Sequence, residues 1–267
     1  MELKYLSYEM TEKGIVIVTL QNPPLNLLSV PMAIEIRELF VELSGNPDVR
    51  CVILTGSGPK AFCAGNELGA GLPAGMPVEM RSPYYTSTFG SFETCPAPVI
   101  AAINGYALGG GCERAMSCDI RIGSDKAKFG MPEVGLGITP GFGGTQRLQR
   151  IVGMSTAMEL VLTSRTIDAQ EALRIGLINH LYPAEEMLDR AIELASIIAS
   201  KAQVAVRQAK QAIRIGKQID MSSAIAFEAE AFGLCFSTED QKDAMQAFLN
   251  KEKLLQLIET IKEKKGV

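Results

Sequence analysis

A change of pattern partway along the 267-residue chain constrains its fold more than any other feature. Before about Thr145, short apolar runs that end in turn residues alternate with stretches of helical spacing. After it, strand signals almost vanish, apart from residues 177–180, and Ala-rich helical periodicity dominates. Strands separated by helices favour parallel crossovers within one sheet. The pattern therefore predicts an α/β protein with a sheet-forming part followed by a helical part.

The individual elements are predicted from apolar spacing. Apolar, partly β-branched runs are typical of buried strands, and apolar residues three and four apart mark one face of a helix. The predicted strands are residues 15–20, 51–56, 98–104 and 119–123. The predicted helices are residues 34–43, 188–200, 202–215, 221–235 and an amphipathic stretch at 251–265.

Composition excludes several classes of function. The chain contains 1 His, which leaves little room for a His-based metal site or proton relay. Its net charge of −4 argues against a strongly basic nucleic-acid binder. The 6 cysteines show no close pair of zinc-ligand spacing and are interpreted as free thiols. Without an apolar signal core or a membrane-length apolar run, the chain is predicted to be cytoplasmic and not membrane-bound.

Two predicted strands are followed by small, Gly-containing turns. Residues 105–111 follow the strand at 98–104 and precede a helical pattern, and residues 61–68 follow the strand at 51–56. The carboxyl ends of parallel strands are where ligands bind, and two converging backbone N–H groups there would form an oxyanion hole. Glycines that merely allow two backbones to approach closely are the alternative interpretation.

Two carboxyl groups lie in apolar surroundings. Glu113 begins a helix beside three glycines, and Glu133 lies in a Pro- and Gly-rich segment at 129–137. Burial raises the pKa of a carboxyl group and suits it to acid–base catalysis near neutral pH. His180 is interpreted as structural, because no G-x-S-x-G motif is present to supply a nucleophile.

Several motifs occur together and in order along nearly the whole chain. They are AFCAGNEL at 61–68, PVIAAINGYALGGGCE at 98–113, FGMPEV at 129–134, PGFGGTQRL at 140–148, AQEA at 169–172 and FSTEDQKDAMQAF at 236–248. Together they resemble the crotonase superfamily, the enoyl-CoA hydratase/isomerase family. The resemblance implies a spiral of ββα units over residues 1–200 and a helical C-terminal region over residues 201–267 used in assembly. It also implies a homotrimer or a dimer of trimers.

The family's shared feature is an oxyanion hole for the enolate of a coenzyme A thioester. Carried over to this sequence, its donors are the backbone N–H groups of Asn66 and Gly110. The substrate-binding positions are Ala64, Asn66, Leu68 and Gly110. No metal and no separate cofactor is implied, since coenzyme A enters as part of the acyl-CoA substrate.

The hydratases of the family use two glutamates, which here correspond to Glu113 and Glu133. The implied reaction is syn addition of water to a trans-2-enoyl-CoA, with Glu113 deprotonating the water and Glu133 supplying a proton to C2. An acyl-CoA double-bond isomerase, a hydratase of a cyclic dienoyl-CoA and a non-catalytic acyl-CoA binder remain as alternatives.

Three features depart from the family pattern or stay open. Glu67 stands where the family most often has Asp, and is either structural or close to the acyl channel. Residues 69–77 carry more Gly and Pro than is usual in this part of the acyl pocket. Lys251 and Lys253 are candidates for contacts to the phosphates of coenzyme A, although a solvated helix face explains them equally well.

Overall fold

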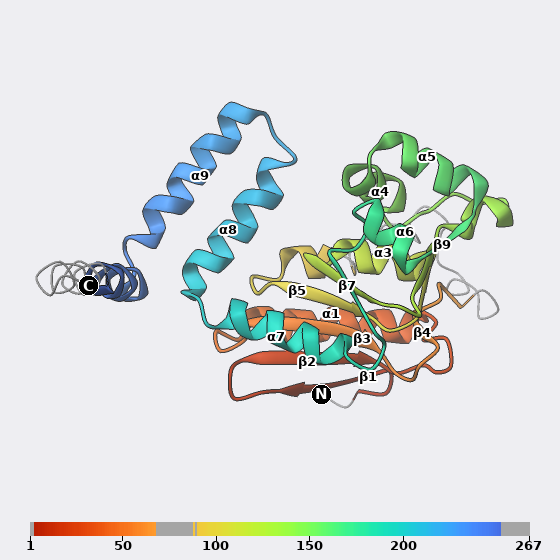
Figure 1. Ribbon diagram of the computed structural model, residues 1–267, viewed down its shortest axis with the longest axis horizontal. Coiled ribbons are helices and arrows are strands. Elements are labelled where there is room, and N and C mark those ends of the chain that lie inside the picture. Colours follow the sequence, from red (N-terminus) through yellow and green to blue (C-terminus); the bar gives the residue numbers. More distant parts are fainter. Residues whose placement is uncertain (1–2, 68–87, 89, 252–267) are drawn as a thin grey trace, which may run out of the picture. The chain divides into compact units, whose positions relative to one another are not determined.

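The computed structural model of the protein describes residues 3–67, 88 and 90–251 (Figure 1). The chain divides into two compact units, Met1–Ser200 and Lys201–Val267. Within the described residues, no helix is both long and apolar enough to cross a membrane.

The first unit is built on a six-stranded sheet. Its strands run in the order β1 (Leu6–Met10), β2 (Ile15–Leu20), β3 (Cys51–Gly56), β5 (Val99–Ile103), β7 (Ile120–Ser124) and β10 (His180–Tyr182). All neighbours are parallel except β1 and β2. The four strands predicted from apolar runs are confirmed to within a residue at each end.

A second, four-stranded sheet explains how the chain spirals. It contains β4 (Ala61–Cys63), β6 (Tyr106–Leu108), β8 (Lys128–Gly130) and β9 (Thr166–Asp168). In each of the pairs β3–β4, β5–β6 and β7–β8, the chain leaves the first sheet and immediately enters the second. The described residues therefore repeat one unit in which two strands belong to different sheets, as the resemblance implied.

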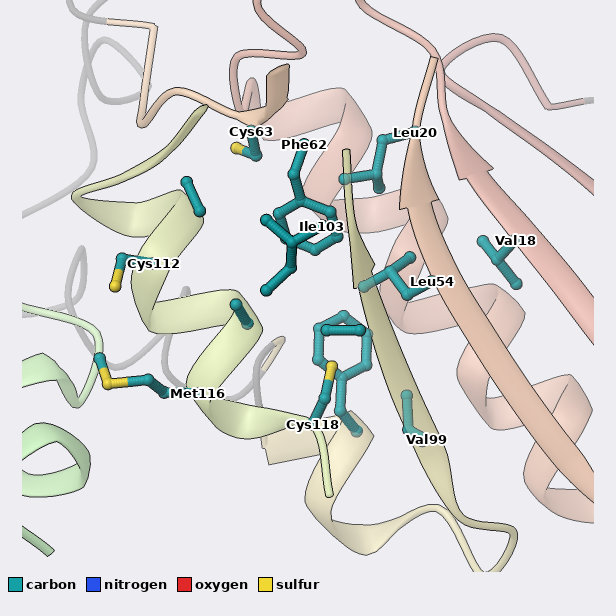
Figure 2. Close-up of a cluster of buried hydrophobic side chains, with 14 of the residues drawn as sticks. Val18, Leu20, Leu54, Phe62, Cys63, Val99, Ile103, Cys112, Met116 and Cys118 are labelled. Atoms are coloured by element: carbon teal, nitrogen blue, oxygen red, sulfur yellow. The ribbon is translucent and has the colours of Figure 1, made fainter. Parts of the chain in front are cut away.

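Alternate side chains of the large sheet enter two separate cores. On one face, Val18, Leu54 and Ile103 pack with α1 (Val30–Gly45) and α3 (Gly110–Ser117). Figure 2 shows Leu54, Phe62 and Ile103 gathered between the strands and α3. On the other face, Ile53 and its neighbours pack against α7 (Met187–Ala199). A strand that is buried on both faces needs a continuous apolar run, which is why these strands were predictable.

The remaining helices follow the strands. In the first unit they are the 3-10 helix η1 (Pro132–Leu136), α4 (Gly144–Val152), α5 (Met154–Thr163) and α6 (Ala169–Arg174). In the second unit α8 (Gln203–Gly216) packs against α9 (Met221–Cys235), and residues 239–251 are also helical. The predicted helices at 188–200, 202–215 and 221–235 are confirmed, whereas the stretch predicted at 251–265 lies outside the described residues after Lys251.

In the C-terminal half, one strand signal differs from the structure and one strand was not predicted. The strand signal at 177–180 belongs largely to a turn, because the N–H groups of Leu177 and Ile178 donate to the carbonyl of Ala172, and β10 begins only at His180. Strand β9 was not predicted, since its three residues are too short to show an alternating pattern.

Candidate active site

The two glycine turns lie side by side in the structure. The turn after β4 contains Gly65, with a φ of +111°, and the turn after β6 leads directly into α3. At Gly111 there is no room for a side chain, because a Cβ would collide with the carbonyl of Cys63. A Cβ at Gly110 would lie 2.5 Å from Oδ1 of Asn66. The glycines of α3 therefore allow its N-terminus to reach the backbone that follows β4.

Two main-chain N–H groups are available at this junction. Asn66 forms an isolated parallel bridge with Leu28, whose N–H donates to Gly65 O at 2.9 Å and whose carbonyl accepts from Glu67 N at 3.0 Å. In such a bridge the N–H of the middle residue, Asn66, points away from the partner strand. Gly110 is the first residue of α3, and the first N–H groups of a helix have no intrahelical acceptor. These are the two donors that the resemblance assigned to the oxyanion hole.

Glu113 is held at the N-terminus of another helix. Its side chain is fully buried, and Oε1 accepts hydrogen bonds from Phe142 N at 2.8 Å and Gly144 N at 2.7 Å. Helix α4 has no capping side chain of its own at Gly143, so the carboxyl group of α3 takes that role. Oε2 has no hydrogen-bond partner among the described residues. One oxygen is thus anchored, and the other is left for a ligand.

The surroundings of Glu113 move its pKa toward neutrality. The pKa of Glu113 is raised to about 7, mainly because the carboxyl group is buried, although the N–H groups of Phe142 and Gly144 lower it. The negative charge of Glu133 raises it further, whereas the positive charge of Arg147 lowers it. A carboxyl group with a pKa near 7 can both accept and release a proton at physiological pH.

Glu133 approaches the turn that precedes α3. It lies on η1, directly after β8, and only 9% of it is exposed. Its Oε1 sits against Gly109, where a Cβ would come within 2.8 Å and where φ is +51°. Burial raises the pKa of this carboxyl as well. The segment from Gly109 to Glu113 therefore carries one buried carboxyl group, contacts a second at Gly109 and contributes one of the two N–H donors.

The other predicted site residues differ in how they are placed. Ala64 is half-buried next to Gly65, and its N–H donates to Leu25 O at 2.9 Å. Leu68 and Lys253 lie outside the described residues. The side chain of Glu67 is exposed, and Lys251 is exposed on the terminal helix of the second unit.

His180 lies on a different element from the residues of this turn. It is exposed at the start of β10 in the six-stranded sheet, where its ring stacks on Tyr182 with the centroids 6.1 Å apart. No group of three or more His, Cys, Asp or Glu side chains in the described part of the chain is arranged to hold a metal ion.

Three residues of the site were not assigned from the sequence: Phe142, Gly144 and Arg147. Their motif, PGFGGTQRL, contributed to the family resemblance without receiving a role. A usable signal was present, since the adjacent glycines at 143 and 144 mark the start of a helix, where the first N–H groups are accessible to an anion.

Comparisons with known proteins find relatives over nearly the whole chain. Residues 10–255 match the family described as enoyl-CoA hydratase/isomerase. A short-chain-enoyl-CoA hydratase of Clostridium acetobutylicum is 50% identical over 257 residues, which cover 95% of this chain and 98% of that protein. A crotonyl-CoA hydratase of Syntrophomonas wolfei is 47% identical and covers 92% of this chain and 95% of its own length.

Solved structures show the same fold. An enoyl-CoA hydratase from Bacillus anthracis has a TM-score of 0.88 at 39% identity, covering 93% of this chain and 97% of that one. An enoyl-CoA hydratase from Mycobacterium smegmatis has a TM-score of 0.88 at 29% identity, with the same coverage. The predicted crotonase fold is thus confirmed, and the chain belongs to the enoyl-CoA hydratase/isomerase family.

Proposed function

We propose that this enzyme is a short-chain enoyl-CoA hydratase, which adds water across the double bond of a trans-2-enoyl-CoA such as crotonyl-CoA. The observation that carries the proposal is the pair of buried carboxyl groups, Glu113 and Glu133, beside the turn and helix start that offer the Gly110 N–H. The relatives from Clostridium acetobutylicum and Syntrophomonas wolfei carry the corresponding activity in their names.

Each group has one role in the proposed reaction. Glu113, ionised and anchored through Oε1, accepts a proton from the water whose oxygen attacks C3. Glu133, whose pKa is raised by burial, delivers a proton to C2. The N–H groups of Asn66 and Gly110 stabilise the negative charge that develops on the thioester oxygen, where one such donor contributes about 3 kcal/mol to lowering the barrier. Ala64 and Leu68 contact the substrate beside these donors.

Two further properties belong to the same proposal. The chain assembles as a trimer or a dimer of trimers through its helical C-terminal region, residues 201–267. It acts in the cytoplasm on an acyl-CoA that brings coenzyme A to the site as part of the substrate.

Loss of crotonyl-CoA absorbance tests the activity, and two substitutions test its residues. Glu113→Gln and Glu133→Gln should each lower kcat by about 10²–10⁴-fold, because each removes a general acid or base and leaves the fold's other contacts in place. Glu38→Gln, on the exposed face of α1, is the matched control and should keep wild-type kcat. Full activity in either site variant would rule out the two-carboxylate mechanism.

Product mass separates the alternatives on the same fold. Hydration adds the mass of one water to the acyl-CoA, and double-bond isomerisation adds nothing. A panel of linear and cyclic enoyl-CoA substrates, each followed by mass spectrometry, therefore identifies the reaction. Binding without turnover across the whole panel would favour a non-catalytic acyl-CoA binder.

A further inference from the structure

The turn that holds Glu113 is itself held by a partly buried ion pair. Arg147, one turn into α4, donates from Nε and Nη2 to the two carboxylate oxygens of Glu93, at 2.9 Å each. Its third nitrogen, Nη1, donates to the carbonyl of Phe142 at 2.8 Å. The Arg147 side chain is only 15% exposed. A guanidinium group can satisfy both partners at once because its donors lie in a rigid planar fork.

The Phe142 carbonyl, which accepts from Arg147, lies in the middle of the turn that binds Glu113. The peptide group between Phe142 and Gly143 sits between the two peptide groups whose N–H donors bind Glu113. Gly143 has a φ of +98°, and the Arg147 guanidinium packs so closely over it that a Cβ would collide with Nη1. Two successive glycines give this segment more backbone freedom than other residues would. The conformation of this segment therefore depends on the guanidinium group that hydrogen-bonds to its middle peptide.

We propose that Arg147 is a positioning residue for the reaction: by linking the peptide between Phe142 and Gly143 to Glu93, it keeps both N–H donors on Glu113 and so orients that carboxyl group toward the attacking water. The inference rests on the proposed function for its catalytic consequence. The positioning of the two N–H donors on Glu113 by Arg147 does not depend on which acyl-CoA is the substrate.

The electrostatic consequence has a definite sign. The charged groups that face Glu113 are Glu133 from η1, which raises its pKa, and Arg147 from α4, which lowers it. The two N–H donors also lower it. Losing Arg147 removes a nearby positive charge and loosens the donors, so both changes raise the pKa of Glu113. The base then stays protonated to a higher pH.

The experiment compares Arg147→Gln and Arg147→Lys with the wild-type enzyme. Both variants should lower kcat by about 10–100-fold, because a small displacement of a catalytic group slows the reaction by this much. KM should stay within about twofold of the wild-type value. The acid limb of the pH–kcat profile should move upward by about 0.5 to 1 pH unit. Lys should not restore the wild-type values, since an ammonium group keeps the charge but cannot bridge Glu93 and Phe142.

Arg150→Gln is the matched control on the same helix. Arg150 is exposed, and its Nη1 donates to Gln146 within α4. This variant should show wild-type kcat and an unchanged pH profile. Glu93→Gln serves as the second test if the Arg147 variants fold poorly, and it should shift the acid limb in the same direction because Arg147 loses its anchor.

Infrared titration separates failure of this inference from failure of the proposed function. The carboxyl band of Glu113, identified by its loss in Glu113→Gln, reports its pKa without any turnover. An upward shift in Arg147→Gln supports the positioning role even if crotonyl-CoA proves not to be the substrate. Wild-type kcat in Arg147→Gln, full rescue by Lys, or lower kcat with an unmoved pH profile and an unmoved Glu113 band would overturn it.

Discussion

At the scale of single residues, the decisive feature is that Glu113 is buried and yet must ionise to work as a base. Water would stabilise its negative charge better than the interior does, and the two N–H donors replace only part of that hydration. The result is a carboxyl group whose pKa of about 7 favours catalysis at a cost to stability.

This cost should appear as a pH-dependent effect of Glu113→Gln. The native pKa lies above the ordinary value of 4.5, so the native state is disfavoured by ionisation as pH rises from 4.5 through about 7. Over this pH range the free energy of unfolding of the wild-type protein therefore falls by up to about 3 kcal/mol, and that of the Gln variant does not show this fall. Urea unfolding of both proteins at about pH 5 and about pH 8.5 measures the difference.

The direction of the change is what matters in that measurement. Glu113→Gln should gain free energy of unfolding relative to the wild type on moving to the higher pH. Equal differences at the two pH values would mean that Glu113 has an ordinary pKa in the folded protein. Glu38→Gln, at an exposed position on α1, should show no pH-dependent difference.

At the scale of elements, the site depends on the close approach of α3 to the backbone after β4. This approach brings the Gly110 N–H and Asn66 together, and it requires the absence of a side chain at Gly111, which faces the carbonyl of Cys63. A backbone carbonyl within a sheet cannot move aside as the end of a flexible side chain can.

Gly111→Ala should therefore destabilise the protein strongly. Because a methyl group there forces α3 away from β4, we expect a loss of about 2–4 kcal/mol, in the range of overpacked and strained core positions. Gly45→Ala is the control, because nothing lies within 4 Å of a Cβ at the end of α1. Urea unfolding should show little change or a small gain for that variant. Wild-type stability of Gly111→Ala would contradict the packing described for α3.

At the scale of the whole molecule, the second unit carries apolar side chains that its own helices leave exposed. On α9, Met221, Ile225 and Phe232 are 75%, 57% and 66% exposed. Exposed apolar groups of this size on one helix are typical of surfaces used in assembly. This agrees with the assembly role proposed for residues 201–267.

Sedimentation equilibrium tests the assembly directly. The particle should have a mass of three or six times the 28.8 kDa of one chain. Met221→Glu combined with Ile225→Glu should reduce that mass, because burying two added charges in an interface is costly. Thr11→Glu, in the first unit, is the control and should keep the wild-type mass. A monomeric wild-type protein at micromolar concentration would contradict the proposed assembly.

The local sequence pattern determined many of the secondary-structure elements and the candidate site residues of this protein. The strands at 15–20 and 51–56 were predictable because both of their faces are buried, which requires a continuous apolar run. Glu113 and Glu133 could be selected because each lies beside Gly or Pro in an apolar segment. The motifs, which extend over nearly the whole chain, are sufficient to identify the family.

Only the tertiary structure decided what depends on contacts between distant residues. The three-residue strands β4 and β9 exist because neighbouring strands complete their hydrogen bonds, and so short a segment has no pattern of its own. Glu113 acquires its pKa from burial and from N–H groups about thirty positions away, at Phe142 and Gly144. Arg147 meets Glu93 across 54 positions of sequence. Sequence thus determined which residue types stand at each turn, and folding determined their charge and orientation, because both depend on what surrounds them in space.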